Sequence, residues 1–268
     1  MATLTAQVSV AEILHDTGTP SRPASAHIRK TMQPLRALKA VRRLIADKDD
    51  TEQVFEIMNA LVGRSTQWGY RRMLTSPVGG VAAYQRTELA DVFQDHNYLR
   101  SLPQGSLGRA YLEFIEAQNF SAYGLVDESR KVVDSEIEAA HPHAWYARRL
   151  RDVHDVWHVL TGYGANALGE GCLVAFSLPQ TRSKGFGVIA FAVGMQFARA
   201  RTGYPCARAV WQAWRDGRKA AWLPEQDYAA LMTMPLEEAR RVLGIPEPYL
   251  YNRVPAELRN AYAGAKAA

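Results

Sequence analysis

The sequence predicts an all-α fold, organised as one compact multi-helix domain. Apolar residues recur at helical spacing along most of the chain, no strand-like alternation persists, and prolines separate the periodic stretches. The chain has 268 residues, of which 47% are hydrophobic and 22% charged, so it is long enough to bury a substantial core. It contains no apolar run of roughly 18 residues or more, which argues against a membrane-spanning helix.

Net charge and cysteine content narrow the possible partners and compartment. The formal net charge of +5 permits an anionic partner, either nucleic acid or a membrane surface, without requiring one. The two cysteines, Cys172 and Cys206, cannot form a disulfide framework. A reducing compartment is therefore expected.

Residues 1–27 lack a sustained period and contain Pro20 and Pro23, so we expect a disordered, flexible N-terminal arm. Acidic residues and the lack of an apolar core argue against a secretory signal. Residues 17–46 contain no acidic residue, and basic residues accumulate from Arg22 to Arg43. This segment resembles either a transit peptide or a basic amphipathic face. Alternatively, the apolar residues Leu35, Leu38, Val41, Leu44 and Ile45 form the buried stripe of an ordinary first helix.

The next elements follow from apolar spacing and turn residues. Residues 51–62 form a helix that Asp50 or Thr51 would cap. A loop is expected at residues 76–80, a short helix at 88–92 and a turn at 102–106. Residues 107–118 form another amphipathic helix.

Longer helices are expected in the second half. Residues 134–162 read as helical, with a boundary near His141 because Pro142 follows. Residues 185–200 are almost wholly apolar and predict a buried helix, in which Gly187 and Gly194 would permit close packing. Two more helices are expected at 207–222 and 236–243. The packed domain is expected to span residues 28–250, followed by a C-terminal tail at 251–268.

Chemistry concentrates in the pattern H-D-x-x-H-x11-E, formed by His154, Asp155, His158 and Glu170. The two histidines are four residues apart, so their side chains lie only about 40° apart on one helix face. Asp155 lies about 60° from His158, close enough either to join the same site or to orient a ligand, and glycines after the helix allow the chain to bring Glu170 back. Imidazoles and carboxylates in this arrangement suit a divalent metal: zinc, iron, manganese or cobalt.

Known helical metal motifs fit this pattern to different degrees. Zincins need a glutamate directly after the first histidine, where this chain has Asp155. HD-type phosphohydrolases need a further histidine and a distant aspartate, which nothing fixes here. Two histidines and a carboxylate also form the facial triad of non-haem iron enzymes. His141 and His143 flank a proline and are interpreted as surface or capping residues. A single histidine on an apolar helix face is often a core residue whose hydrogen bonds are made within the protein.

Around this motif the chain resembles the metal-binding ubiquinone biosynthesis family, the fourth member of the coenzyme Q series. The motif of that family is matched at His154, Asp155, His158 and Glu170. The flanking stretches at 102–108, 148–153 and 166–170 also fit. The similarity extends from about residue 34 to residue 246.

The resemblance implies an all-helical fold in which these four residues hold a divalent metal and form the catalytic site. It also implies oxidative decarboxylation at C1 of a polyprenylated hydroxybenzoate-type ring, with a hydroxyl replacing the carboxylate. An apolar lipid-binding channel would accommodate the polyprenyl tail. Candidates to line it are residues 186–197 together with Val159, Leu160, Leu173 and Val174, although each of these is equally expected in the core.

Other residues near the motif have two interpretations each. Tyr163 and Asn166 would hydrogen-bond to the metal ligands, or they are ordinary residues of a surface loop. Arg148, Arg149 and Arg151 would meet an anionic headgroup or the ring carboxylate, or they form a solvated helix face.

Two classes of function therefore compete: a metal-dependent enzyme, and a non-catalytic lipid-binding scaffold of the biosynthetic complex with a structural metal. An unrelated helical metallohydrolase is a third possibility. The resemblance implies as partners a polyprenylated ubiquinone precursor, other coenzyme Q biosynthesis proteins and a second copy of the chain, and no nucleic-acid motif is present. It implies peripheral attachment to the cytoplasmic face of a bacterial inner membrane, or to the matrix side in a mitochondrion, aided by the basic residues from Arg22 to Arg43.

Overall fold

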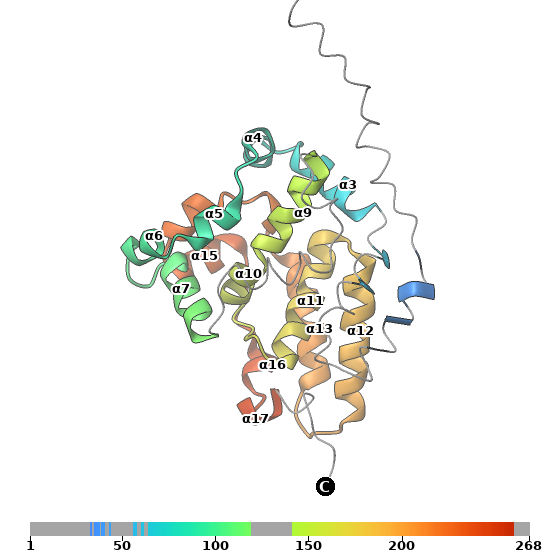
Figure 1. Cartoon of the computed structure of the whole chain (residues 1–268). Helices are drawn as coiled ribbons and strands as arrows, with labels where there is room; N and C mark the ends of the chain where they lie inside the picture. Colours follow the sequence, from blue (N-terminus) through green and yellow to red (C-terminus); the bar gives the residue numbers. More distant parts are fainter. Residues whose placement is uncertain are drawn as a thin grey trace, which may run out of the picture.

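Three long helices, α11 (Ala167–Thr181), α12 (Lys184–Arg199) and α13 (Cys206–Lys219), lie side by side and form one half of the molecule (Figure 1). The computed structural model describes residues 64–118 and 141–259, together with scattered positions between 33 and 61. All regular elements among these residues are helices, and the only pairing of β type is an isolated bridge between Ser106 and Pro235. The predicted all-α class is confirmed.

Glycines let the long helices approach closely. A Cβ atom at Gly217 would lie 2.2 Å from the carbonyl oxygen of Phe176, and one at Gly171 would lie 2.4 Å from Val193. The glycines expected to serve this purpose, Gly187 and Gly194, have no neighbour closer than 3.5 Å to such a Cβ. The positions that need glycine are therefore those on α11 and α13, not those on α12.

Shorter helices make up the other half of the molecule (Figure 1). They are α3 (Ser65–Met73), α4 (Pro77–Gln85), α5 (Leu89–Gln94), α6 (His96–Ser101), α7 (Leu107–Ala117), α9 (Pro142–Asp152), α10 (His154–Thr161), the 3-10 helix η2 (Leu223–Glu225), α14 (Tyr228–Thr233) and α15 (Leu236–Leu243). The main core cluster joins both halves, because Tyr111, Leu160 and Phe176 belong to it. Two smaller clusters lie beside it among the described residues, and the predicted single all-helical domain is confirmed.

The chain continues beyond the expected domain boundary at residue 250. It forms α16 (Tyr249–Asn252) and α17 (Ala256–Arg259). Tyr251 and Val254 are buried in the main core cluster. Burial of these two side chains extends the packed domain at least to residue 254.

Several local predictions differ from the structure. The loop expected at 76–80 is the start of α4, where Ser76 caps the helix by accepting a hydrogen bond from the Gly79 amide and Pro77 occupies the first turn. Helices α3, α6, α11 and α14 were not expected. The described part of the helix expected over 134–162 forms two helices, since α9 ends and α10 begins at Val153, and residues 134–140 lie outside the described residues.

The predicted first helix is described only in part. Ala37 and Ala40 are buried against Ile189 of α12. Leu35 is 75% exposed, so its predicted place in the buried stripe is wrong. The structure does not describe the other four members of that stripe. It also does not describe the predicted N-terminal arm, residues 1–27, or the basic residues Arg29 and Lys30 that follow it.

Helix α12 is less buried than its composition predicts. Ile189, Ala190 and Phe197 are buried, whereas Phe191 is 69% exposed and Met195 is 37% exposed. Only one face packs against α11 and α13, so the prediction of a buried helix is wrong for the opposite face. No helix among the described residues is both long enough and apolar enough to cross a bilayer.

Candidate metal centre

The candidate metal centre lies where α10 meets the amino end of α11. Helix α10 carries His154 in its first turn and His158 in its second. It ends at Gly162, whose φ of 74° is the left-handed conformation that favours glycine. Helix α11 then begins after Asn166, whose side chain accepts a hydrogen bond of 2.9 Å from the Gly169 amide. This cap places Glu170 in the first turn of α11.

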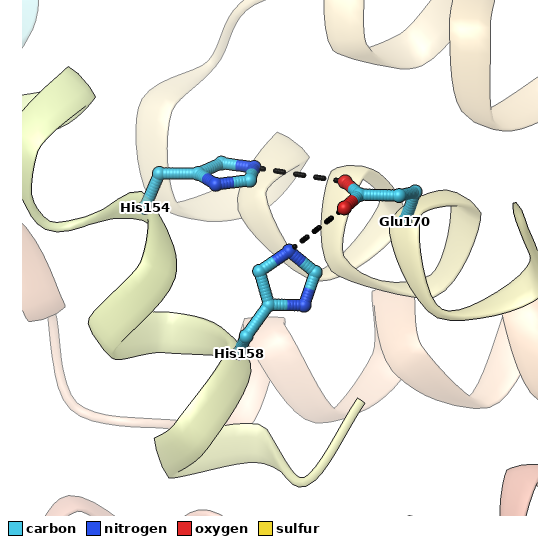
Figure 2. Close-up of side chains that lie close together, drawn as sticks. All are labelled: His154, His158 and Glu170. Atoms are coloured by element: carbon cyan, nitrogen blue, oxygen red, sulfur yellow. Dashed lines mark ion pairs between the residues drawn. The ribbon is translucent and has the colours of Figure 1, made fainter. Parts of the chain in front are cut away.

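His154, His158 and Glu170 point toward one another (Figure 2). Nε2 of His158 lies 3.2 Å from Oε1 of Glu170, and Nε2 of His154 lies 3.8 Å from Oε2. One ligand atom from each of the three residues lies within 4.8 Å of the others. This separation suits a single ion bound between them.

The opposite nitrogen of each imidazole already has an acceptor. Nδ1 of His158 lies 2.9 Å from the backbone carbonyl oxygen of Tyr163. Nδ1 of His154 lies 3.0 Å from Oδ1 of Asp155. A carbonyl and an ionised carboxylate only accept hydrogen bonds, so each Nδ1 holds the proton and each Nε2 presents a lone pair to the centre.

A lone pair facing a carboxylate is unfavourable unless a cation or a proton lies between them. Nε2 of His158 is buried and makes no hydrogen bond among the described residues, although Glu170 is its ion-pair neighbour. A divalent cation would satisfy this atom, Nε2 of His154 and the carboxylate together. The residues present therefore fit a metal of the type that nitrogen and oxygen ligands bind.

Charge interactions shift the pKa values at the centre. Burial opposes protonation of His154, but the hydrogen bond to Asp155 and the charge of Glu170 outweigh it, so the pKa of His154 is raised. Burial would raise the pKa of Glu170, but the contact with His158 at 3.2 Å and the charge of His154 outweigh it, so the pKa of Glu170 is lowered. The pKa of Asp155 is lowered by His154 in spite of burial. Without metal, His154 thus attracts a proton, and the carboxyl groups of Asp155 and Glu170 stay ionised.

The centre is closed on one side and open on the other. Phe114 of α7 stacks on the ring of His158, with ring centroids 5.5 Å apart and an interplanar angle of 19°. The side chain of His158 is 1% exposed, whereas those of His154 and Glu170 are 30% and 45% exposed. An incoming molecule can therefore reach the centre from the side of His154 and Glu170.

Residues far away in the sequence support the ligands. The hydroxyl of Tyr251 accepts hydrogen bonds from the Asn166 side chain at 2.7 Å and from the Gly164 amide at 3.0 Å. The guanidinium of Arg240 donates to the carbonyl oxygens of Val159 and Leu160, each at 3.0 Å, and so caps the end of α10. No sequence signal pointed to Tyr251, Arg240 or Phe114.

Of Tyr163 and Asn166, only Tyr163 hydrogen-bonds to a proposed ligand, whereas the Asn166 side chain bonds to Tyr251 and Gly169. Tyr163 does so through its backbone carbonyl, not through its hydroxyl, and its buried side chain belongs to the core. Asn166 acts through the helix cap. Of the candidate channel residues, Val159, Leu160 and Leu173 lie buried in the main core cluster, and Val174 packs against it.

The three arginines before the motif have structural partners. Arg148 pairs with Glu88 at 2.6 Å, and Arg151 pairs with Asp152 at 3.0 Å. Arg149 is buried and donates to the carbonyl oxygens of Pro224 and Gln226 at 2.9 and 2.6 Å. The interpretation as a solvated helix face is therefore wrong for Arg149.

The histidines upstream lie away from the ligand group. The side chain of His141 caps α9 by accepting a hydrogen bond from the His143 amide. Both residues are half-buried. The expected capping role of His141 is confirmed.

Comparison with known proteins gives a consistent match. Residues 37–249 match the sequence profile of the family described as coenzyme Q (ubiquinone) biosynthesis protein Coq4. The human ubiquinone biosynthesis protein COQ4 homolog, mitochondrial, is 30% identical over 207 residues, which cover 72% of this chain and 72% of the human protein. The bovine protein of the same name is 29% identical over 195 residues, covering 72% and 71%.

A solved structure shares the fold. The crystal structure of a Nostoc punctiforme protein assigned to ubiquinone biosynthesis superposes with a TM-score of 0.59. The match covers 81% of this chain and 100% of the other, at 21% sequence identity. This likeness independently supports the helical architecture.

Proposed function

Because the chain belongs to the Coq4 family of coenzyme Q (ubiquinone) biosynthesis proteins, we propose that it catalyses a metal-dependent step on the ubiquinone ring. The step is oxidative decarboxylation at C1 of a polyprenylated hydroxybenzoate-type precursor. The ring carboxyl group leaves as carbon dioxide and a hydroxyl takes its place, with one oxygen atom supplied by an external oxidant. The observation that carries the proposal is the convergence of two imidazole Nε2 atoms and the carboxylate of Glu170.

The proposed ligands are His154, His158 and Glu170, and the ion is zinc, iron, manganese or cobalt. When bound, a divalent cation supplies a Lewis acid that polarises the carboxylate or phenolate of the ring. The family resemblance implies Asp155 as a fourth ligand. Its hydrogen bond to Nδ1 of His154 instead supports a positioning role, in which Asp155 holds the imidazole with its lone pair toward the ion.

The exposure pattern supports a catalytic site over a structural one. Three protein ligands leave coordination positions for a substrate, whereas structural zinc sites are typically closed by four. The exposed side of His154 and Glu170 admits the ring, while Phe114 excludes water behind His158. These features favour the enzyme over a lipid-binding scaffold with a structural metal.

The same proposal includes where the protein works and with what. It attaches peripherally to the membrane that contains the polyprenyl substrate, at the cytoplasmic face of a bacterial inner membrane or the matrix side of the mitochondrial one. Its partners there are other coenzyme Q biosynthesis proteins and a second copy of the chain. The human and bovine relatives are themselves named mitochondrial, which supports an association with the respiratory membrane.

Complementation of cells that lack the endogenous protein tests this function. We expect His154→Ala and Glu170→Gln to abolish quinone synthesis and to accumulate the ring-carboxylated precursor, at normal protein abundance. The matched control is Glu113→Gln on the exposed face of α7, which should restore quinone fully.

Two outcomes would reject parts of the proposal. Normal quinone levels with both site variants would exclude a metal-dependent catalytic role. Loss of partner enzymes without accumulation of the precursor would favour the scaffold. Elemental analysis of the purified wild-type protein should give about one metal ion per chain, and a Glu170→Gln protein should contain much less.

A further inference from the structure

A cavity of about 320 Å³ opens where α3 meets the carboxyl ends of α11 and α13. Its lining includes Arg72, Arg182 and Arg218 and contains no acidic residue. These arginines come from the last turn of α3, the C-cap of α11 and the last turn of α13, three helices seen together in Figure 1. Glu170 lies near the other end of α11, roughly 16 Å away at 1.5 Å per residue. The cavity is therefore separate from the candidate metal centre.

Aromatic rings hold the guanidinium groups in place. Cζ of Arg72 lies 4.3 Å from the ring centroid of Trp222, and Cζ of Arg182 lies 4.1 Å from that of Trp68. The two tryptophans contact each other edge to face, with centroids 6.0 Å apart. Stacking engages the faces of the guanidinium groups and leaves their in-plane N–H groups available to acceptors.

The third arginine is held in a similar way. Cζ of Arg218 lies 4.9 Å from the ring centroid of Trp214. Each of the three guanidinium groups therefore rests on an indole ring. An anion in the cavity would meet positioned donors and would not have to order long, mobile side chains.

These three arginines lack counter-charges in the part of the chain that the structure describes. None of their guanidinium groups makes an ion pair or a hydrogen bond there, whereas Arg148, Arg240 and Arg241 each pair with a glutamate. Three cations around one cavity repel each other, and a bound anion would remove that repulsion.

Each of the three arginines lies at the carboxyl end of a helix, where the helix dipole favours a positive charge, but neutral side chains supply hydrogen bonds at the ends of α11 and α13. Nε2 of Gln180 donates to the carbonyl oxygens of Gly217 at 2.7 Å and Ala221 at 3.2 Å. Nε1 of Trp222 donates to the carbonyl oxygen of Gln180 at 2.6 Å. Neutral side chains thus satisfy these carbonyl groups, and none of them accepts a hydrogen bond from the three guanidinium groups among the described residues.

We infer that this cavity binds a phosphate group with at least two negative charges, as a phosphomonoester or a diphosphate. Planar guanidinium groups match the spacing of phosphate oxygens and donate to them in pairs. The group would belong either to a soluble phosphorylated molecule or to a lipid headgroup. The inference goes beyond the proposed function and does not depend on the metal centre.

Titration calorimetry with inorganic diphosphate at low ionic strength tests the site in the full chain. We expect one-to-one binding to the wild type, and affinity at least about tenfold lower in Arg72→Gln and Arg218→Gln, since each loses charge-assisted hydrogen bonds. Arg208→Gln removes the same charge from the exposed amino end of α13 and should change the affinity by less than about twofold. Arg182 has a φ of 55°, so Arg182→Gln is compared only after its thermal melt matches that of the wild type.

Two results would overturn the inference. One is that the wild type does not bind diphosphate at millimolar concentration. The other is that Arg208→Gln loses as much diphosphate affinity as Arg72→Gln and Arg218→Gln. A flotation assay with phosphatidylcholine vesicles containing phosphatidic acid separates the two sources. Vesicle binding that diphosphate displaces and Arg72→Gln removes would identify a lipid headgroup. Diphosphate binding without vesicle binding would identify a soluble phosphorylated ligand, and both results support the site.

Discussion

Nδ2 of Asn166 donates a hydrogen bond of 2.7 Å to the hydroxyl of Tyr251, 85 residues further along the chain. The Gly164 amide donates to the same hydroxyl. One oxygen atom on α16 therefore fixes two points of the short loop between His158 and Glu170. The position of Glu170 relative to the histidines depends on this long-range contact.

Replacing Tyr251 by Phe should destabilise the fold and weaken metal binding. The ring still fits, but the Asn166 amide and the Gly164 N–H lose their acceptor, and we expect the free energy of unfolding to fall by about 1 kcal/mol or more. Urea unfolding and a metal titration measure the two effects. Tyr249→Phe is the control, because Tyr249 is 59% exposed. Equal behaviour of the two variants would contradict the anchoring role of the Tyr251 hydroxyl.

Asp155→Asn separates a positioning role from a ligand role. If Asp155 only orients His154, the metal affinity should fall by about 10- to 100-fold while the stoichiometry at saturation stays the same. A loss of binding as complete as in Glu170→Gln would instead make Asp155 a ligand. Asp91→Asn on the exposed side of α5 removes the same charge and should leave the affinity unchanged.

Metal affinity should decrease as the pH falls. The pKa of His154 is raised above its usual value of 6.5, so in the metal-free protein a proton competes for Nε2 already near neutral pH. The pKa of Glu170 is lowered, and this carboxylate remains ionised in the same range. Below the pKa of His154 we expect about a tenfold loss of affinity per pH unit. Titrations between pH 8 and pH 5 check this, and a flat profile would be inconsistent with protonation of His154.

Two Gly→Ala changes, one at the contact between α11 and α13 and one on α12, should affect stability differently. At Gly217 the added methyl group would lie 2.2 Å from the backbone oxygen of Phe176, so the helices must separate, and we expect a loss of about 1–3 kcal/mol. At Gly194 the nearest atom is 3.8 Å away, and alanine should be neutral or stabilising by up to about 1 kcal/mol. Urea unfolding of both variants measures the difference. Similar stabilities would show that the close approach at Gly217 is not required.

Arg149→Met should be strongly destabilising. The change leaves the carbonyl oxygens of Pro224 and Gln226 without their charged donor, and we expect a loss of about 2–4 kcal/mol. Arg199→Met removes an exposed arginine at the end of α12 and serves as the control. A small effect at both positions would mean that water replaces the guanidinium of Arg149.

Local patterns predicted those helices whose limits are encoded locally. Residues 107–118 and 236–243 match α7 and α15 closely, because apolar spacing and nearby turn residues define both. Helix α4 was missed because two glycines after Ser76 and Pro77 resemble a loop. Its packing decides otherwise: Gly79 is buried close to Met73. Composition also predicted an apolar helix at α12 without revealing that the face of Phe191 stays exposed.

The sequence likewise predicted only those features of the candidate site that depend on local spacing. Four-residue spacing places His154 and His158 on one face of any helix, and that local geometry appears in the structure. The hydrogen bond of Asp155 to Nδ1 depends on the side-chain conformation of His154, which spacing does not determine. Supporting contacts from Arg240 and Tyr251 depend on tertiary structure, and no pattern near residues 154–170 encodes them.

The contact with Tyr251 also sets an order of events during synthesis. His154, His158 and Glu170 are synthesised before α13, α15 and α16. A nascent chain at that stage carries every proposed ligand but lacks the hydroxyl that fixes the loop between them. Under the proposed function, stable loading with metal would therefore follow the synthesis of α16.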